Sequence, residues 1–115
     1  MTEQAPTPGR TTIAPNVLLT IARLTTLKVD GISHLSSVPG GFNRLFKRNQ
    51  NQGIRINVED GIVDVDLYVV LNSDVNVREV SRKLQKNVKR AISDMVGMEV
   101  GQINVHIDDI KFDVN

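Results

Sequence analysis

Hydrophobic and polar residues alternate along the two segments that flank Asp60 and Gly61. Strict alternation indicates half-buried strands, and an Asp-Gly pair between them predicts a two-residue hairpin turn with both residues at positive φ. Such a turn sets a register that gives the hairpin one aliphatic and one polar face. The expected aliphatic pairs are Val58 with Val63, Ile56 with Val65 and Ile54 with Leu67, and the polar pairs are Asn57 with Asp64 and Arg55 with Asp66.

The period of the hydrophobic pattern changes from two to 3.6 after Asn72. Asn76 followed three residues later by Glu79 predicts a helix N-terminus with a capping box, and Gly97 predicts the other end of this helix. Apolar residues recur between these ends at steps of three and four, so they form one stripe that we expect to pack on the aliphatic face of the hairpin. The stripe consists of Val77, Val80, Leu84, Val88, Ala91, Ile92 and Met95.

A shorter helix is predicted near the N-terminus. Pro15 suits the first helical position, and the helix is expected to end near Lys28, before Gly31. Its packing face comprises Val17, Leu18, Ile21, Ala22 and Thr25.

The segments around this helix have weaker patterns. Residues 1–9 are expected to be a disordered tail, and residues 10–13 are compatible with a short strand. Residues 29–38 fit either an extended segment or a loop, and residues 39–53 have the Gly, Asn and Gln content of an irregular loop.

Residues 103–107 alternate and predict a final strand, which follows a turn bracketed by Gly97 and Gly101. The parity then changes, because a regular strand would point Ile110 away from the side that holds the earlier apolar residues. We therefore expect a β-bulge or the strand end at residues 108–109.

The order of these elements predicts an α+β fold. A short optional strand, a helix, two strands, a helix and a strand suit a single compact domain over residues 10–113, with both helices on one face of a three- or four-stranded sheet.

The composition of the chain excludes several classes of function. The chain has 115 residues, no Cys, and 14 basic against 13 acidic residues, which leaves a net charge of +1. The absence of Cys excludes disulfides, thiol catalysis and Cys-ligated zinc. A balanced charge provides no overall field that would attract nucleic acid or anionic lipid. Neither an apolar run of membrane-spanning length nor a signal-peptide pattern is visible.

A series of short motifs over residues 10–112 is similar to the alkaline shock protein family of envelope stress response proteins. The matching segments are Ile13-Ala14-Pro15, Val29-Asp30-Gly31-Ile32, Gly53-Ile54, the strand over 63–70, Val80 with Leu84-Gln85 and Val88, Met95 with Gly97-Met98 and Val100, and Ile103-Asn104-Val105. Two positions depart from the family pattern: Asn72-Ser73 stand where a glycine is common, and Asp30 stands where a proline is frequent. Both departures are compatible with turns.

The resemblance implies a small, cytoplasmic, non-enzymatic protein of mainly Gram-positive bacteria. It implies a role in cell-envelope stress or homeostasis through contacts with a protein partner, such as a membrane-anchor protein that holds it near the membrane, or with further copies of itself. Some members are associated with fatty-acid metabolism genes, so the resemblance fixes no single pathway.

Acidic residues on the polar sheet face are candidates for metal binding. Asp64, Asp66, His106 and Asp108 would approach one another if the last strand lies beside the hairpin, and carboxylates with a histidine can bind a divalent cation. An ordinary cross-strand pair of Asp66 with Arg55 is the favoured alternative. We therefore expect no metal, no cofactor and no catalytic residue.

Two surfaces are candidates for partner binding. Basic residues recur on the outward side of the second helix. They either form a solvated face or bind a protein, a membrane or phosphate groups. The alternative function is that of a nucleic-acid-binding domain. Ile62, Tyr68 and Val70 add apolar area to the outer sheet face, which suggests self-association. The expected partner-binding residues are Arg44, Lys47, Arg48, Tyr68, Arg78, Arg82, Lys86 and Lys89.

Overall fold

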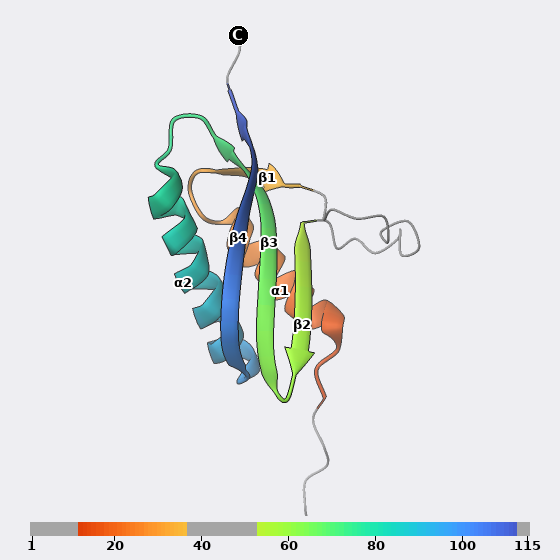
Figure 1. Cartoon of the computed structure of the whole chain (residues 1–115). Coiled ribbons are helices and arrows are strands. Elements are labelled where there is room, and N and C mark those ends of the chain that lie inside the picture. Colours follow the sequence, from red (N-terminus) through yellow and green to blue (C-terminus); the bar gives the residue numbers. More distant parts are fainter. Residues whose placement is uncertain (1–11, 37–52, 113–115) are drawn as a thin grey trace, which may run out of the picture.

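The computed structural model describes residues 12–36 and 53–112 of the chain. In these ranges the elements are α1 (Pro15–Leu27), β1 (Ile32–Leu35), β2 (Ile54–Glu59), β3 (Ile62–Asn72), α2 (Val77–Val96) and β4 (Glu99–Lys111). Figure 1 shows α1 behind the sheet and α2 beside β4. The predicted α+β class, with two helices on one face of a four-stranded sheet, is confirmed.

Strand β3 is the centre of the sheet. Its first half pairs antiparallel with β2 and its second half with β1, so these two short strands follow each other along one edge of β3. The other edge pairs in parallel with β4, which the chain reaches through α2. A parallel neighbour requires such a crossover, and the amphipathic helix provides it.

The predicted hairpin is confirmed in turn and register. Asp60 has φ 54° and Gly61 φ 77°, as a turn with two left-handed residues requires. All five expected cross-strand pairs are present, from Val58 opposite Val63 to Ile54 opposite Leu67.

The core lies between β3 and the two helices. Val63, Val65, Leu67, Val69 and Leu71, the odd-numbered residues of β3, have no exposed surface. Four residues of the predicted stripe on α2 pack against them: Val80, Leu84, Val88 and Ile92.

Burial was predicted for every member of the two helical stripes, and for three of them this prediction was wrong. Val77 is 41% exposed and Met95 70% exposed, and both lie in the terminal turns of α2. On α1, Val17 is 44% exposed, and Thr26 is buried beside Leu18 and Ala22.

The boundaries of both helices agree with the predictions. Pro15 begins α1, and the Asn76 side chain accepts a hydrogen bond of 3.0 Å from the backbone N–H of Glu79 at the start of α2. Gly97 ends α2 with φ 75°. None of the helices in the described ranges has the length and apolar character needed to cross a membrane.

Strand β4 contains two irregularities. The register shifts between Ile107 and Asp109, which confirms the predicted bulge and returns Ile110 to the inner side, opposite Leu71. A second shift lies near Gly101, inside the strand. The turn predicted to extend to Gly101 was therefore wrong, since β4 already begins at Glu99.

The structure describes only part of the segments whose sequence patterns were weak. Residues 29–38 contribute the short strand β1. Thr12 and Ile13 are not in a strand, and the rest of the segment expected over residues 10–13, the predicted tail and nearly all of the loop over 39–53 lie outside the described residues.

Candidate functional site

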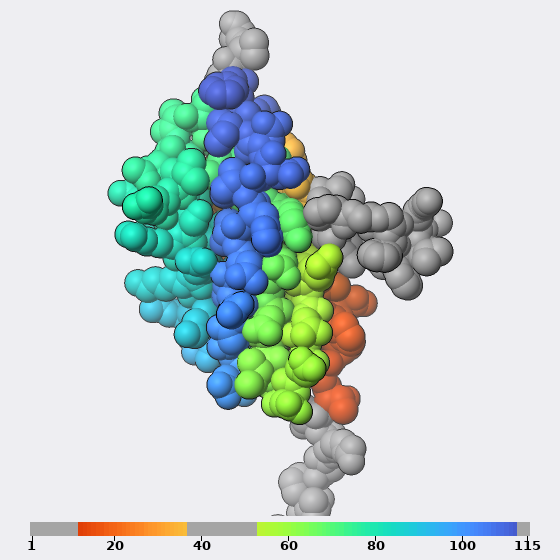
Figure 2. All heavy atoms as spheres, in the orientation of Figure 1, coloured from red at the N-terminus to blue at the C-terminus, as the bar shows by residue number. Residues whose placement is uncertain are grey.

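The face of the sheet that points away from the helices is open among the described elements (Figure 2). Its side chains come from the even-numbered residues of β3 and from their neighbours on β2 and β4, because successive residues of a strand point to opposite faces. The register places Asp66 between Arg55 and Asn104, and Tyr68 beside His106. The sequence pattern predicted this polar outer face.

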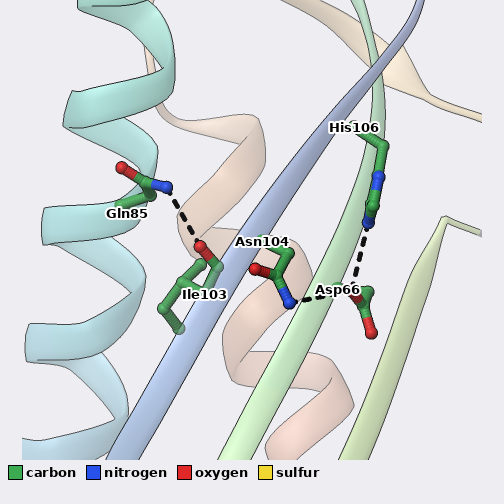
Figure 3. A network of polar contacts seen from close by, with 5 residues as sticks. All are labelled: Asp66, Gln85, Ile103, Asn104 and His106. Carbon is green, nitrogen blue, oxygen red and sulfur yellow. Dashed lines mark hydrogen bonds and ion pairs between the residues drawn. The ribbon is translucent and has the colours of Figure 1, made fainter.

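Asp66 is the centre of a small polar network (Figure 3). Its Oδ1 atom accepts a hydrogen bond of 3.2 Å from Asn104 Nδ2 and lies 3.1 Å from Nε2 of His106. The partners that the structure shows for this carboxylate therefore come from β4, and not from Arg55, which was expected to neutralise it.

Asp64 has a different role. Its Oδ1 atom accepts a 2.8 Å hydrogen bond from the backbone N–H of Gln102, at the irregular position of β4. The carboxylate occupies the space that a Cβ atom at position 101 would need, so Gly101 allows this close approach. Asp64 thus helps to hold the start of β4 on β3.

The ring of Tyr68 stacks on the imidazole of His106. The ring centroids are 4.4 Å apart and the ring planes differ by 12°. The His106 side chain is 44% exposed and Tyr68 is half-buried, so the stack remains accessible on the open face although the two rings cover each other's inner faces. Val70, which was expected to extend this patch, is only 7% exposed, so Ile62 and Tyr68 supply the apolar area.

The proposed metal ligands do not assemble. Within residues 12–36 and 53–112, no group of three or more His, Asp or Glu side chains has the spacing of a metal site. Asp64 and Asp66 each accept a hydrogen bond from a residue on β4, and Asp108 lies at the bulge.

The basic side chains of α2 point to solvent. Arg78, Arg82, Lys86 and Lys89, which we call the basic row, are all exposed, whereas the opposite side of α2 carries the buried stripe. Arg44, Lys47 and Arg48, the other basic candidates, lie outside the described residues.

A further contact joins α2 to the edge of the sheet. Gln85 Nε2 donates a 3.0 Å hydrogen bond to the carbonyl oxygen of Ile103 on β4. The sequence pattern missed this contact, which depends on the packing of α2 beside β4, and also the Tyr68–His106 stack, which depends on the register between β3 and β4.

Sequence comparisons link the chain to bacterial relatives. The uncharacterized protein YqhY of Bacillus subtilis is 29% identical over 107 residues, which are 91% of this chain and 79% of YqhY. The uncharacterized protein Spy1535 of Streptococcus pyogenes is 34% identical over 105 residues, 89% of this chain and 79% of Spy1535.

Among solved structures, the copper form of the MamM CTD superimposes with a TM-score of 0.51 and covers 83% of this chain and 85% of its own. At 8% identity this likeness shows the fold alone. The model of the alkaline shock protein 23 family, described as having a cell envelope-related function, matches residues 3–112. Together with the similarity to Spy1535, this match shows that the chain belongs to the alkaline shock protein family.

Proposed function

We propose that this protein is a non-enzymatic interaction module of cell-envelope stress response or homeostasis, which binds a protein partner through the open face of its sheet. The observation that carries the proposal is the accessible Tyr68–His106 stack at the middle of that face. The envelope-related function of the family supports the cellular role.

The partner is a protein at the cytoplasmic side of the membrane, such as a membrane anchor, or a further copy of this chain. Aromatic side chains are frequent centres of protein interfaces because they bury a large area with few rotatable bonds. Here the polar network around Asp66 borders the stack on the side of the hairpin, as polar groups border apolar centres in interfaces.

Replacement of Tyr68 by alanine is expected to weaken partner binding about tenfold to a hundredfold, the range for loss of an aromatic interface residue. The measurement is a quantitative cross-linking pull-down from cells that make the tagged full-length chain at its native level. Tyr68→Phe keeps the ring and should retain most of the binding.

A charge-neutralised Arg23→Ala variant on α1 is the control for this experiment, since Arg23 is exposed on the helical layer. Equal recovery of every cross-linked protein with wild type, Tyr68→Ala and Arg23→Ala would refute the assignment of the open sheet face.

The basic row supports a second candidate function, the binding of nucleic acid. Its exposed cations could contact phosphates, but the only tyrosine of the chain lies on the sheet and the chain has no tryptophan, so α2 offers no aromatic platform for bases. We expect fluorescence-anisotropy titrations with single-stranded and duplex DNA and RNA to show no micromolar affinity. A micromolar affinity that falls steeply with salt would favour this second function instead.

A further inference from the structure

Opposite charges are divided between the two layers of this protein. Helix α2 carries six basic and two acidic residues, a net charge of +4. Residues 54–72 and 99–111, which form β2, β3, their turn and β4, carry two basic and seven acidic residues, a net charge of −5. The whole chain is nearly neutral, at +1, so copies do not repel one another overall.

The acidic residues gather at the hairpin end of the open face. Glu59 on β2 and Glu99 on β4 both lie opposite Ile62, so the two exposed carboxylates flank one apolar side chain. Asp64 and Asp66 follow Ile62 on the same face of β3. We call Glu59, Asp64, Asp66 and Glu99 the acidic strip. Figure 2 shows this face, with β2, β3 and β4 side by side.

The basic row is about as long as the open face, and the acidic strip covers about 13 Å of that face, from the level of Ile62 to Asp66, at roughly 3.3 Å per strand residue. From Arg78 to Lys89 the row extends for about 16 Å, at 1.5 Å per helical residue. From Ile62 to Tyr68 the open face extends for about 20 Å, at roughly 3.3 Å per strand residue, and the three strands β2, β3 and β4 span about 10 Å between the outer two. A helix of about 10 Å diameter therefore fits along this face.

We infer that the open sheet face of one copy binds the basic row of α2 of a second copy, so that copies of this chain stack head to tail. This inference rests on the proposed function, because it names the occupant of the same face. The acidic strip would repel phosphates of lipid or nucleic acid, whereas the basic row complements it in sign. Ile62 and the Tyr68–His106 stack supply the apolar surface between the ion pairs.

The position of the two surfaces determines the kind of assembly. Since the basic row lies on α2 and the open face on the strands, a copy that uses its open face keeps its own basic row free. A contact between two different surfaces does not close by itself and produces an open stack or a ring. Ion pairs at such a surface are screened by salt, so the assembly should depend on ionic strength.

The test uses the full chain at tens of micromolar in analytical ultracentrifugation. We expect concentration-dependent species larger than a dimer at low salt, and monomer at about 0.5 M salt, where the screening length is only a few ångströms. One variant reverses the helix (Arg82→Glu with Lys86→Glu), and another reverses the strip (Glu59→Lys with Glu99→Lys). Each variant alone should show a rise of tenfold or more in the dissociation constant.

An equimolar mixture of the two variants should associate again. The unchanged basic row of the strip variant then meets the unchanged acidic strip of the helix variant, and the two altered surfaces also complement each other. Arg23→Glu on α1 with Lys28→Glu at its C-cap is the matched control for the helix variant, since it lowers the net charge by the same amount and should leave assembly intact. Restored association also demonstrates that both variants are folded.

Three results would overturn the inference. These are a wild-type chain that stays monomeric at low salt, a helix-reversed variant that still associates as wild type does, and a mixture that does not associate. The second result would indicate a contact between two sheet faces. Each of these outcomes leaves Tyr68-dependent capture of another protein unaffected, so the pull-down distinguishes failure of the stacking from failure of the proposed function.

Discussion

Replacement of Leu84 by alanine is expected to lower the free energy of unfolding by about 2–5 kcal/mol, the usual range for truncation of a buried leucine. Leu84 has no exposed surface and lies at the middle of the stripe by which α2 packs into the core. The cost combines the lost transfer of its methyl groups from water with the cavity that remains. Since small domains are stable by only about 5–15 kcal/mol, this one change would remove a large share of the stability.

Urea denaturation followed by circular dichroism measures this loss as a lower midpoint at an unchanged slope. Met95→Ala is the matched control, because Met95 belongs to the same sequence stripe but is 70% exposed. We expect its effect to stay within about 0.5 kcal/mol. Comparable losses for both variants would contradict the burial difference between the centre and the end of α2.

The sequence predicts the hairpin and α2 well because their determinants are local. Asp60 and Gly61 impose the turn, the turn imposes the register, and alternation decides which face is buried. Asn76 and Gly97 define α2 through hydrogen bonds and a left-handed residue within a few positions of each end. None of these features depends on a distant segment.

Periodicity gives the direction of a buried stripe but not its extent. Val77 and Met95 follow the same spacing as Leu84, yet both are exposed in the terminal turns of α2. Whether the last turn of a helix is covered depends on the length and twist of the opposite layer. That information is absent from the helical segment itself.

The candidate site was predicted as a surface but not as a set of contacts. Alternation placed Asp66, Tyr68 and His106 on the outer face, and the structure agrees. Their pairing depends on the parallel register of β3 and β4, which contains two shifts and spans about 40 residues of sequence. A register of this kind is set by α2 and by the packing of the whole layer, so local patterns do not determine it.

Replacement of Gly53 by alanine is expected to destabilise the fold by roughly 2–5 kcal/mol. Gly53 has φ 79°, a conformation that costs a residue with a Cβ atom about 1–2 kcal/mol. Its environment adds a second cost, since an added Cβ would lie 2.6 Å from the carbonyl oxygen of Ser36 and 2.7 Å from Leu35 Cβ. Relief of such contacts requires backbone movement, which costs about 1–3 kcal/mol.

Gly53 is surrounded by hydrogen-bonded backbone, which cannot easily move to make room for a Cβ atom. Its carbonyl accepts a 2.8 Å hydrogen bond from the N–H of Tyr68, and the Tyr68 carbonyl accepts one of the same length from Ser36. Gly53 therefore lies where the end of β1 and the start of β2 meet on one edge of β3, directly beside the residue that forms the aromatic stack. A shift there should also disturb Tyr68.

Gly61→Ala separates the two costs of the Gly53 change. Gly61 has nearly the same φ, 77°, but no atom lies within 4 Å of an added Cβ. Gly61→Ala should lower the free energy of unfolding only by the backbone cost of about 1–2 kcal/mol. Chemical denaturation of both variants should therefore show Gly53→Ala to be less stable by about 1–3 kcal/mol. Equal midpoints for the two variants would mean that β1 and β2 do not meet as closely at Gly53 as the structure places them.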